Sequence, residues 1–550
     1  MRQAIKNTIK GFYETHTAPS LHHMWQTRQP IVWGLAILIG VLGAYAILAM
    51  IYLIGLVQWL WIGYEAENIA ITIAATKPAW QIIAGPTIGG LVVGLLLAFV
   101  ASGRRAQGMA DVIAARAVKG AHMPWKTGLT SALVSSISLG AGASAGREGP
   151  AVHLGATIAS LLGSRLSLPF AARRIILGCG AAAAVSASFN APIAGVIFAH
   201  EVILGHYALS ALAPIIMSSV IATTITRFYH GAAPTFAIPQ YHITSTWEFP
   251  AFLLLGLVCG LVAVGLQTTI ARADTTAKAI AMPIWLRPVI GGLAIGVFAV
   301  FIPEILGVGY EVTNLALREK YTLGFLLILL IAKTLTIAIT LASRFGGGIF
   351  SPSLYLGAVT GGAFGLIAAM LFPHLASTSG VYSIVGMGAV AGAVLGAPLS
   401  TVLIVFELTG GYEITIALLL AVSVATIVLK AIVGQSFFSW QLAMRGLFLD
   451  HGPHTRIVKT WTVKEFMTPL NQEETSGQTI DMSEFSDRPK LSPDDTLEKA
   501  FQVFGKGNYT RIPVFKDVSD INSLIGWADY TAALAEYNQA LVAANEEEHR

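Results

Sequence analysis

Charged residues are scarce in this 550-residue chain: Asp, Glu, Lys and Arg make up only 12% of it. Soluble globular proteins carry about 25%. Hydrophobic residues make up 55%, and the mean hydropathy is +0.68. This balance excludes a soluble protein and predicts that most of the chain faces lipid or other buried helices. A net charge of +4 is too small to indicate a nucleic-acid partner.

Cysteine is also scarce. Cys179 and Cys259 both lie in apolar stretches rich in Gly and Ala, so we interpret them as buried small residues rather than as a disulfide or metal site. The sequence shows no catalytic triad, no nucleotide-binding Gly-rich loop followed by Lys, and no His/Cys metal spacing. His22 and His23 lie in a polar segment, where we expect them to be solvated. We therefore expect no enzyme activity, no metal and no cofactor.

Apolar segments fill the chain from about residue 30 to 447. The first, near 31–62, is too long for a signal-peptide core. Several others are shorter than the roughly 20 residues that span a bilayer, and Gly and Pro interrupt them. Such segments are tolerated at membrane depth where they line a cavity or pack inside protein, which predicts a transport pathway built from broken helices. The predicted segments are 31–62, 80–101, 125–142, 149–166, 173–188, 192–205, 208–227, 248–271, 284–303, 323–343, 350–372, 380–395, 397–409 and 414–433.

Basic residues indicate the topology. Arg104, Arg105, Arg116, Lys119 and Lys126 lie between the second and third apolar segments. The positive-inside rule places this loop on the cytoplasmic side, together with the basic segment 1–29. That segment is either an amphipathic helix on the membrane surface or a disordered tail.

A small soluble α/β module is predicted at 455–540, after the apolar segments end near 449. We expect a helix over 496–504, capped by Ser492 or by Asp494 with Asp495, and short strands at 511–515 and 523–527. Residues 541–550 are expected to form a solvated tail.

Two halves of the membrane region, about 30–230 and 245–447, resemble each other. Each half has a Pro followed by Leu-Gly-Ala, then a Gly-x-Gly-Ala stretch, then Ala-Pro with Glu nine residues after the Pro. Packing of small residues explains the glycines but not the Pro-to-Glu spacing. The pattern predicts an internal repeat and leaves its direction, parallel or inverted, open. The matched landmarks are Pro150 and Pro352, Leu154–Ala156 and Leu356–Ala358, Gly178–Ala181 and Gly386–Ala389, Pro192 and Pro398, Glu201 and Glu407.

The stretch Gly146-Arg147-Glu148-Gly149-Pro150 is the strongest candidate site. Its glycines permit close backbone approach, and Pro150 suits the first turn of a helix, whose free N–H groups attract anions. A glutamate inside the membrane is expensive and therefore indicates function. Ionised Glu148 would occupy an anion site itself and leave it when protonated. The alternative is a helix cap paired with Arg147.

Gly346–Pro352, with the sequence GGGIFSP, is the corresponding point of the second half. Its glycines expose the backbone, so the N–H groups of Ile349 and Phe350, after Gly348, would face an anion. The alternative is a plain turn at a helix start.

GREGP at 146–150, GGGIFSP at 346–352, FNAPIAG at 189–195 and GAPLS at 396–400 resemble motifs of the CLC family of chloride channels and transporters. The resemblance covers about residues 30–447. It implies an all-helical membrane fold of two inverted halves of broken and tilted helices, assembled as a homodimer with one pore per subunit. It also implies that both termini are cytoplasmic and that the protein lies in the cell (inner) membrane.

The resemblance assigns roles to single residues. Glu148 matches the gating glutamate on the extracellular side, and the amides of Ile349 and Phe350 match those that bind chloride. Gly146, Arg147, Gly149 and Gly348 complete these two anion-binding loops.

Three positions depart from the family pattern. Gln107, beside Gly108, replaces the serine that coordinates the central anion, and Phe438 replaces a tyrosine, with Phe437 as the alternative match. Val202 replaces the internal proton-transfer glutamate. His200 and Glu201, with Glu148, remain as proton-path candidates.

The C-terminal module resembles one CBS unit, carried by Met467-Thr468-Pro469 and by TRIPVF at 510–515. An insertion interrupts it at about 471–489. CBS units normally work in pairs and often bind adenine nucleotides, so a single unit leaves pairing across the dimer open and makes nucleotide binding a weak expectation.

For the whole chain we predict transport of chloride or similar small anions. Proton-coupled exchange, an uncoupled channel and a fluoride-exporting relative remain open.

Overall fold

The structure is a computed structural model with two units, Met1–Phe438 and Ser439–Arg550, which we describe separately. The predicted N-terminal segment, except Gln29, and most of the insertion at 471–489 lie outside the described residues. The structure describes residues 29–549 apart from 64–71, 73, 119, 232–235, 237–240, 410–411, 449–452, 471–488, 508, 518–519 and 521–522.

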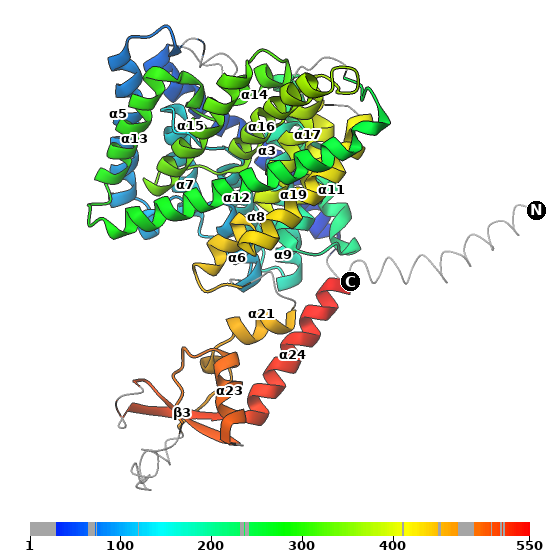
Figure 1. Cartoon of the computed structure of the whole chain (residues 1–550). Helices are drawn as coiled ribbons and strands as arrows, with labels where there is room; N and C mark the ends of the chain where they lie inside the picture. Colours follow the sequence, from blue (N-terminus) through cyan, green and yellow to red (C-terminus); the bar gives the residue numbers. More distant parts are fainter. Residues whose placement is uncertain are drawn as a thin grey trace, which may run out of the picture. The chain divides into compact units, whose positions relative to one another are not determined.

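The first unit is built from helices (Figure 1). In its described part, eight helices are long and apolar enough to cross a membrane, and four apolar segments are shorter. Large apolar side chains such as Phe99 and Phe228 are more than 80% exposed, as expected of residues that face lipid. Its main helices are α3 (Gln29–Ile62), α5 (Ala79–Phe99), α6 (Met109–Val118), α7 (Trp125–Gly140), α8 (Glu148–Arg165), α9 (Phe170–Phe189), α10 (Pro192–Phe198), α11 (Leu209–His230), α12 (Phe249–Ala279), α13 (Leu286–Phe301), α14 (Tyr310–Leu317), α15 (Leu323–Ala342), α16 (Phe350–Leu371), α17 (Ser379–Leu395), α18 (Pro398–Thr409) and α19 (Tyr412–Val433).

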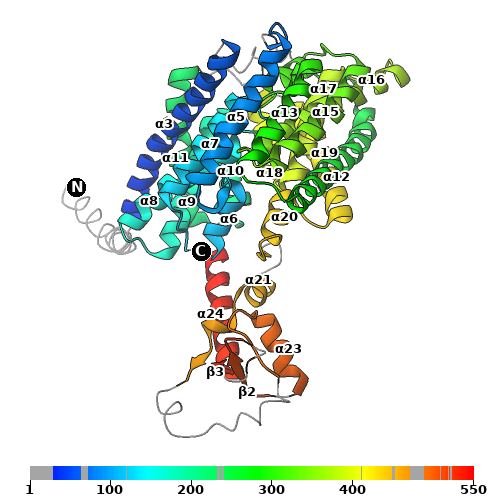
Figure 2. The same cartoon turned by 90° about the vertical axis from the view of Figure 1, so that its left-hand side faces the viewer.

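The same order of eight helices occurs in both halves, which supports the predicted repeat. In chain order the counterparts are α3 and α12, α5 and α13, α6 and α14, α7 and α15, α8 and α16, α9 and α17, α10 and α18, α11 and α19. Of these pairs, α5 and α13 lie side by side in both views (Figures 1 and 2).

Glu201 and Glu407 show that the halves run in opposite directions where they meet. Glu201, after α10, accepts the N–H groups of Leu399 and Ser400 in the first turn of α18, at 3.1 and 2.7 Å. Glu407, near the end of α18, accepts those of Ile193 and Ala194 in the first turn of α10, at 3.1 and 2.7 Å. Each glutamate therefore caps the other half's helix, which requires α10 and α18 to be antiparallel.

Glycines allow close helix contacts at matched positions of the two halves. A Cβ on Gly155 of α8 would lie 2.4 Å from the carbonyl oxygen of Gly180 on α9. A Cβ on Gly357 of α16 would lie 2.2 Å from that of Gly386 on α17. Both positions belong to the Leu-Gly-Ala landmarks of the repeat, which explains why the spacing of these small residues is repeated.

The second unit contains a three-stranded antiparallel sheet, in the order β1-β3-β2, and helices around a small core. The predicted strands are confirmed as β2 (Arg511–Phe515) and β3 (Leu524–Asp529), which pair with Pro513 opposite Trp527. The other elements are α20 (Phe437–Ala443), which crosses the division between the units, α21 (Pro453–Thr460), β1 (Thr468–Pro469), α23 (Leu497–Gly507) and α24 (Tyr530–His549).

Two local predictions for this unit differ from the structure. The predicted helix caps were wrong: α23 begins at Leu497, and the Thr496 hydroxyl accepts the N–H of Lys499 at 3.3 Å. Asp495 instead accepts the N–H of Ser492 at 2.8 Å, within the preceding turn. The expected tail at 541–550 is helical through His549, as the end of α24.

Candidate functional site

The two glycine loops meet at the starts of α8 and α16. Gly146 and Gly348 exchange two backbone hydrogen bonds, each 2.7 Å long, as an isolated antiparallel bridge. The closeness depends on glycine, because a Cβ on Gly146 would lie 3.0 Å from Cδ of Pro352 and 3.1 Å from the backbone nitrogen of Ser351. The structure therefore brings together the predicted stretches 146–150 and 346–352, and the first N–H groups of two helices from different halves lie at one place.

Glu148 is fully buried at this place, and its carboxylate contacts the other half rather than its own helix. The Tyr310 hydroxyl donates to Oε1 at 2.7 Å, and the Ser351 hydroxyl donates to the same oxygen. The backbone N–H of Ser351, in the first turn of α16, lies 3.4 Å from Oε2. We call Glu148, Tyr310 and Ser351 the Glu148 cluster.

Neighbouring side chains enclose the Glu148 cluster. Arg147 donates to the carbonyl oxygen of Ser188 at 3.2 Å, and its guanidinium carbon lies 5.2 Å from the centre of the Tyr310 ring. Phe350 packs against Phe189, with ring centres 4.9 Å apart. Ile349 and Phe350 are 1% and 2% exposed. The N–H groups of these two residues belong to the helix start, where intrahelical acceptors are lacking.

Lys333 fixes the loop that carries Tyr310. Its ammonium group is fully buried and donates to the carbonyl oxygens of Ile305 and Gly307, both at 2.9 Å. Tyr310 is the first residue of α14 and comes three residues after Gly307. Tyr310 also lines a pocket of about 40 Å³, together with Trp61. That volume is enough for a water molecule.

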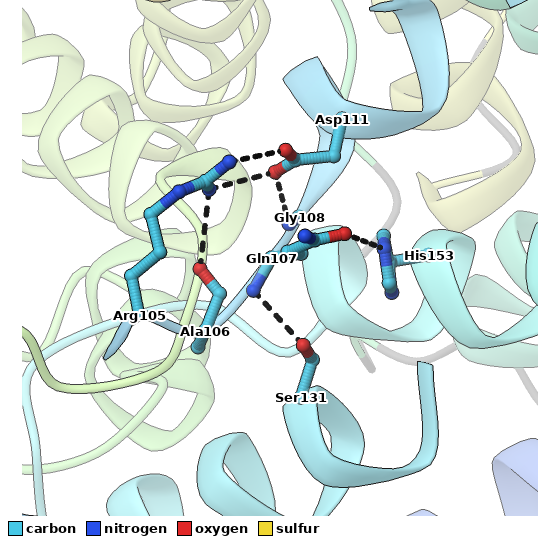
Figure 3. Close-up of polar contacts among 7 residues, drawn as sticks. All are labelled: Arg105, Ala106, Gln107, Gly108, Asp111, Ser131 and His153. Carbon is cyan, nitrogen blue, oxygen red and sulfur yellow. Dashed lines mark hydrogen bonds and ion pairs between the residues drawn. The ribbon is translucent and has the colours of Figure 1, made fainter. Parts of the chain in front are cut away.

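Gln107 lies in a second polar group, shown in Figure 3. Its backbone N–H donates to the Ser131 hydroxyl at 3.0 Å, and its side-chain Oε1 lies 3.2 Å from Nε2 of His153. Since Oε1 faces the ring, the amide N–H2 group points away from it. We call Gln107, Ser131 and His153 the Gln107 cluster. Beside it, the N–H of Gly108 donates to Asp111 at 3.0 Å.

Asp111 also pairs with Arg105, at 2.5 and 3.0 Å, so the loop before α6 is tied to the helix start (Figure 3). Helix α8 connects the two clusters, because Glu148 and His153 are five residues apart on it, or about 7.5 Å along its axis. Nδ1 of His153 is buried and has no hydrogen-bond partner in the described part of the chain.

The remaining predicted residues lie elsewhere. Phe438 is 7% exposed in α20, with its ring 6.1 Å from that of Phe437. His200 and Val202 lie with Glu201 in a six-residue π-helix, Ala199–Leu204, and His200 Nδ1 lies 3.0 Å from the carbonyl oxygen of His206. The hydrogen bonds of Glu201 lead to α18, so a proton-path role for this group stays a prediction. Among the described residues, no group of His, Cys, Asp or Glu is arranged to hold a metal ion.

Residues 89–430 match the family described as voltage gated chloride channel. The chain belongs to this family, the CLC family. As a member it is a multi-pass membrane protein that transports anions, and not an enzyme. The predicted all-helical fold with a small α/β module at its C-terminal end is confirmed.

Several relatives resemble this CLC chain along most of the membrane region. A ClcB-like chloride channel protein from Ralstonia nicotianae is 33% identical over 74% of this chain and 96% of its own length. The H(+)/Cl(-) exchange transporter ClcA of Cronobacter sakazakii is 32% identical over 56% of this chain and 67% of its own. Chloride channel protein CLC-e of Arabidopsis thaliana is 32% identical, and the chain covers 52% of it.

Solved structures share the fold. A slow cyanobacterial Cl-/H+ antiporter has a TM-score of 0.64 at 23% identity, over 75% of this chain and 96% of that one. A eukaryotic CLC transporter has a TM-score of 0.64 at 18% identity, over 94% of this chain and 90% of that one. A CLC-type fluoride/proton antiporter has a TM-score of 0.63 at 23% identity, over 75% and 98%.

Sequence reasoning missed Tyr310, Ser351 and His153. The repeat contains a signal for Tyr310, because Gly108-Met109 at the start of α6 corresponds to Gly309-Tyr310 at the start of α14. Ser351 is the counterpart of Gly149, one residue before the matched prolines. His153 carried no signal, since a histidine within an apolar helix is more often a packed residue.

Proposed function

We propose that this CLC chain carries chloride or a similar small monovalent anion through a pathway in each subunit, gated by Glu148. One observation carries the proposal: the buried Glu148 carboxylate lies where the starts of α8 and α16 meet and accepts hydrogen bonds from Tyr310 and Ser351. In this structure the carboxylate oxygens stand in for the transported anion. Protonation would remove the charge that holds Glu148 there, and the anion would then take its place.

The surroundings suit binding that is reversible. An anion that leaves water needs replacements for its hydration, and helix N-termini and backbone N–H groups supply them. A lysine or arginine inside the pathway would hold the anion too tightly for fast exit. Arg147 is close, but it donates to the carbonyl oxygen of Ser188 and lies over the Tyr310 ring.

The test is anion flux from proteoliposomes loaded with chloride, recorded from pH 4 to 8 for the wild type and Glu148→Gln. We expect wild-type flux to rise as the pH falls, and the variant to be fast at every pH. The matched control is Glu248→Gln. Glu248 is 3% exposed and also accepts hydrogen bonds from a tyrosine and a serine hydroxyl, those of Tyr382 and Ser377, at 2.8 and 2.6 Å. A pH dependence that survives in Glu148→Gln would refute the gating role.

Proton-coupled exchange is the second candidate function. The names of the ClcA relatives state H+/Cl- exchange, and Glu148 is able to carry a proton. Val202 weighs against coupling, since its side chain holds no proton. The same liposome experiment decides the matter when external pH is recorded: proton uptake in fixed proportion to chloride efflux establishes exchange, and chloride efflux without it establishes an uncoupled pathway. Fluoride in place of chloride tests the fluoride alternative.

We further propose that both termini are cytoplasmic, in the cell membrane, and that the protein is a homodimer. The basic loop around Arg104, Arg105 and Lys126 supports the orientation. The CLC family supports the dimer. Labelling of single cysteines introduced at 104 and 126 from either side of the membrane tests the first, and the mass of the purified protein in detergent tests the second.

We propose that the C-terminal module is a single CBS-like unit that functions without a bound cofactor. The match to the eukaryotic CLC transporter covers 94% of this chain, more than the first unit spans, and so supports a shared C-terminal module. Calorimetric titration with ATP tests the proposal; micromolar binding would refute it.

A further inference from the structure

The Glu148 cluster contains two hydroxyl groups that bind one carboxylate oxygen. Tyr310 and Ser351 both donate to Oε1, and their own oxygens lie 3.3 Å apart. The three residues are at most 4% exposed. Both hydroxyl groups come from the second half of the chain, on α14 and α16, whereas Glu148 comes from α8. Departure of the carboxylate therefore leaves both hydroxyl groups in place.

The vacated place would be rich in donors. Without Glu148 the cluster has three donors, namely the two hydroxyl groups and the N–H of Ser351. The hydroxyl groups can satisfy only one donor between themselves, through the Ser351-to-Tyr310 contact. Departure of the carboxylate removes the acceptor that these donors share, and the loss of a buried acceptor is costly inside a protein. An anion at the place of the carboxylate would replace that acceptor.

We propose that the hydroxyl groups of Tyr310 and Ser351 bind the transported anion as well as the gate: they hold Glu148 while it occupies the site and then donate to the anion that replaces it. This inference rests on the proposed gating function. The ligand is a small monovalent anion with no fixed geometry, such as chloride. Neutral hydroxyl donors bind such an ion without the full charge that would slow its exit.

A comparison with the donors of the Gln107 cluster supports this assignment. At the Gln107 cluster, the Ser131 hydroxyl accepts from the backbone of Gln107, and the side chain of Gln107 is engaged with His153. Phe438 carries no hydroxyl group at all. The Gln107 cluster thus supplies one hydroxyl group, that of Ser131, against two at the Glu148 cluster, which predicts that the tighter binding site is at Glu148.

Tyr310→Phe and Ser351→Ala test the proposal in two backgrounds. In the Glu148 background, each loses a bond to the ionised gate, so the pH of half-maximal liposome flux should rise. In the Glu148→Ala background the gate is absent, and each should weaken chloride binding measured by calorimetry, by about tenfold.

The controls remove equally buried hydroxyl groups elsewhere. Tyr382→Phe removes the hydroxyl that donates to Glu248, and Ser353→Ala removes one that donates to the carbonyl oxygen of Ile349 on the same helix as Ser351, at 2.6 Å. Both should leave flux and chloride affinity unchanged. A monodisperse elution profile confirms that each variant is folded.

Two results would overturn the inference. Unchanged chloride affinity in the Glu148→Ala background would mean that the hydroxyl groups serve only the gate, and an unmoved pH profile would mean that they do not hold it. Failure of the gating function itself gives a different result, because Glu148→Ala alone would then keep the wild-type pH dependence.

Discussion

Two buried glutamates of this protein are held by the same chemical groups. Glu148 accepts from a tyrosine hydroxyl, a serine hydroxyl and the backbone N–H of that serine. Glu248 accepts from the same three groups, supplied by Tyr382 and Ser377. The two differ in place: Glu148 joins the two halves at a pair of helix starts, whereas Glu248 and its partners all belong to the second half. The position between the halves therefore distinguishes Glu148, the proposed gate, from Glu248.

The largest effect on chloride flux is expected from a substitution that fills the space between the two helix starts. A Cβ on Gly146 would lie 2.7 Å from Oε2 of Glu148 and 3.1 Å from the backbone nitrogen of Ser351. Gly146→Ala should therefore exclude both the carboxylate and an anion, and lower liposome chloride flux at least tenfold at every pH. Gly265→Ala is the control, because nothing lies within 4 Å of its Cβ position. Normal flux in Gly146→Ala would show that the place between the helix starts is not on the pathway.

A smaller effect, on chloride affinity, is expected from adding a hydroxyl group at position 438. If Phe438 lines the pathway, Phe438→Tyr adds a donor and should tighten chloride binding by about fivefold in calorimetry. Phe437→Tyr is the control, because Phe437, one residue earlier in α20, is the alternative match to the family's tyrosine. A gain in Phe437→Tyr alone would assign the role to Phe437 instead.

The smallest effects are expected for the structural carboxylates Glu201 and Glu407. Each caps a helix of the other half through two N–H groups, a contribution of about 1 kcal/mol to stability. Glu201→Gln and Glu407→Gln should each lower the temperature of heat-induced aggregation in detergent by about 1–3 °C, with an unchanged pH profile of flux. Loss of proton movement in Glu201→Gln alone would instead make Glu201 a proton carrier.

Motif spacing was enough to predict the repeat and to mark the two glycine loops as candidate sites, whereas their meeting is visible only in the structure. Gly146 permits close backbone approach, and Pro150 and Pro352 fix the backbone at the helix starts, so their consequences can be read from the chain. The partners of Glu148 could not be read in this way. Tyr310 reaches Glu148 from 162 positions away in the sequence, and only the packing of α14 against α16 brings it there.

The direction of the repeat also needed the structure. Matched landmarks look the same in parallel and inverted halves, because spacing contains no information on orientation. The reciprocal caps at Glu201 and Glu407 supply it.

In the C-terminal unit, strand positions followed from β-branched and aromatic residues, whereas the helix cap was misplaced, since Ser492, Asp494, Asp495 and Thr496 all have suitable side chains.

The two backbone hydrogen bonds between Gly146 and Gly348 restrict the conformational changes that this transporter can make during transport. A cycle in which the halves rock against each other as rigid bodies would have to break both 2.7 Å bonds in every turnover. Rotation of one glutamate side chain breaks neither. Under the proposed gating function the two halves would stay in place while one side chain moves, and side-chain rotation and proton arrival would set the rate rather than the slower motion of whole domains.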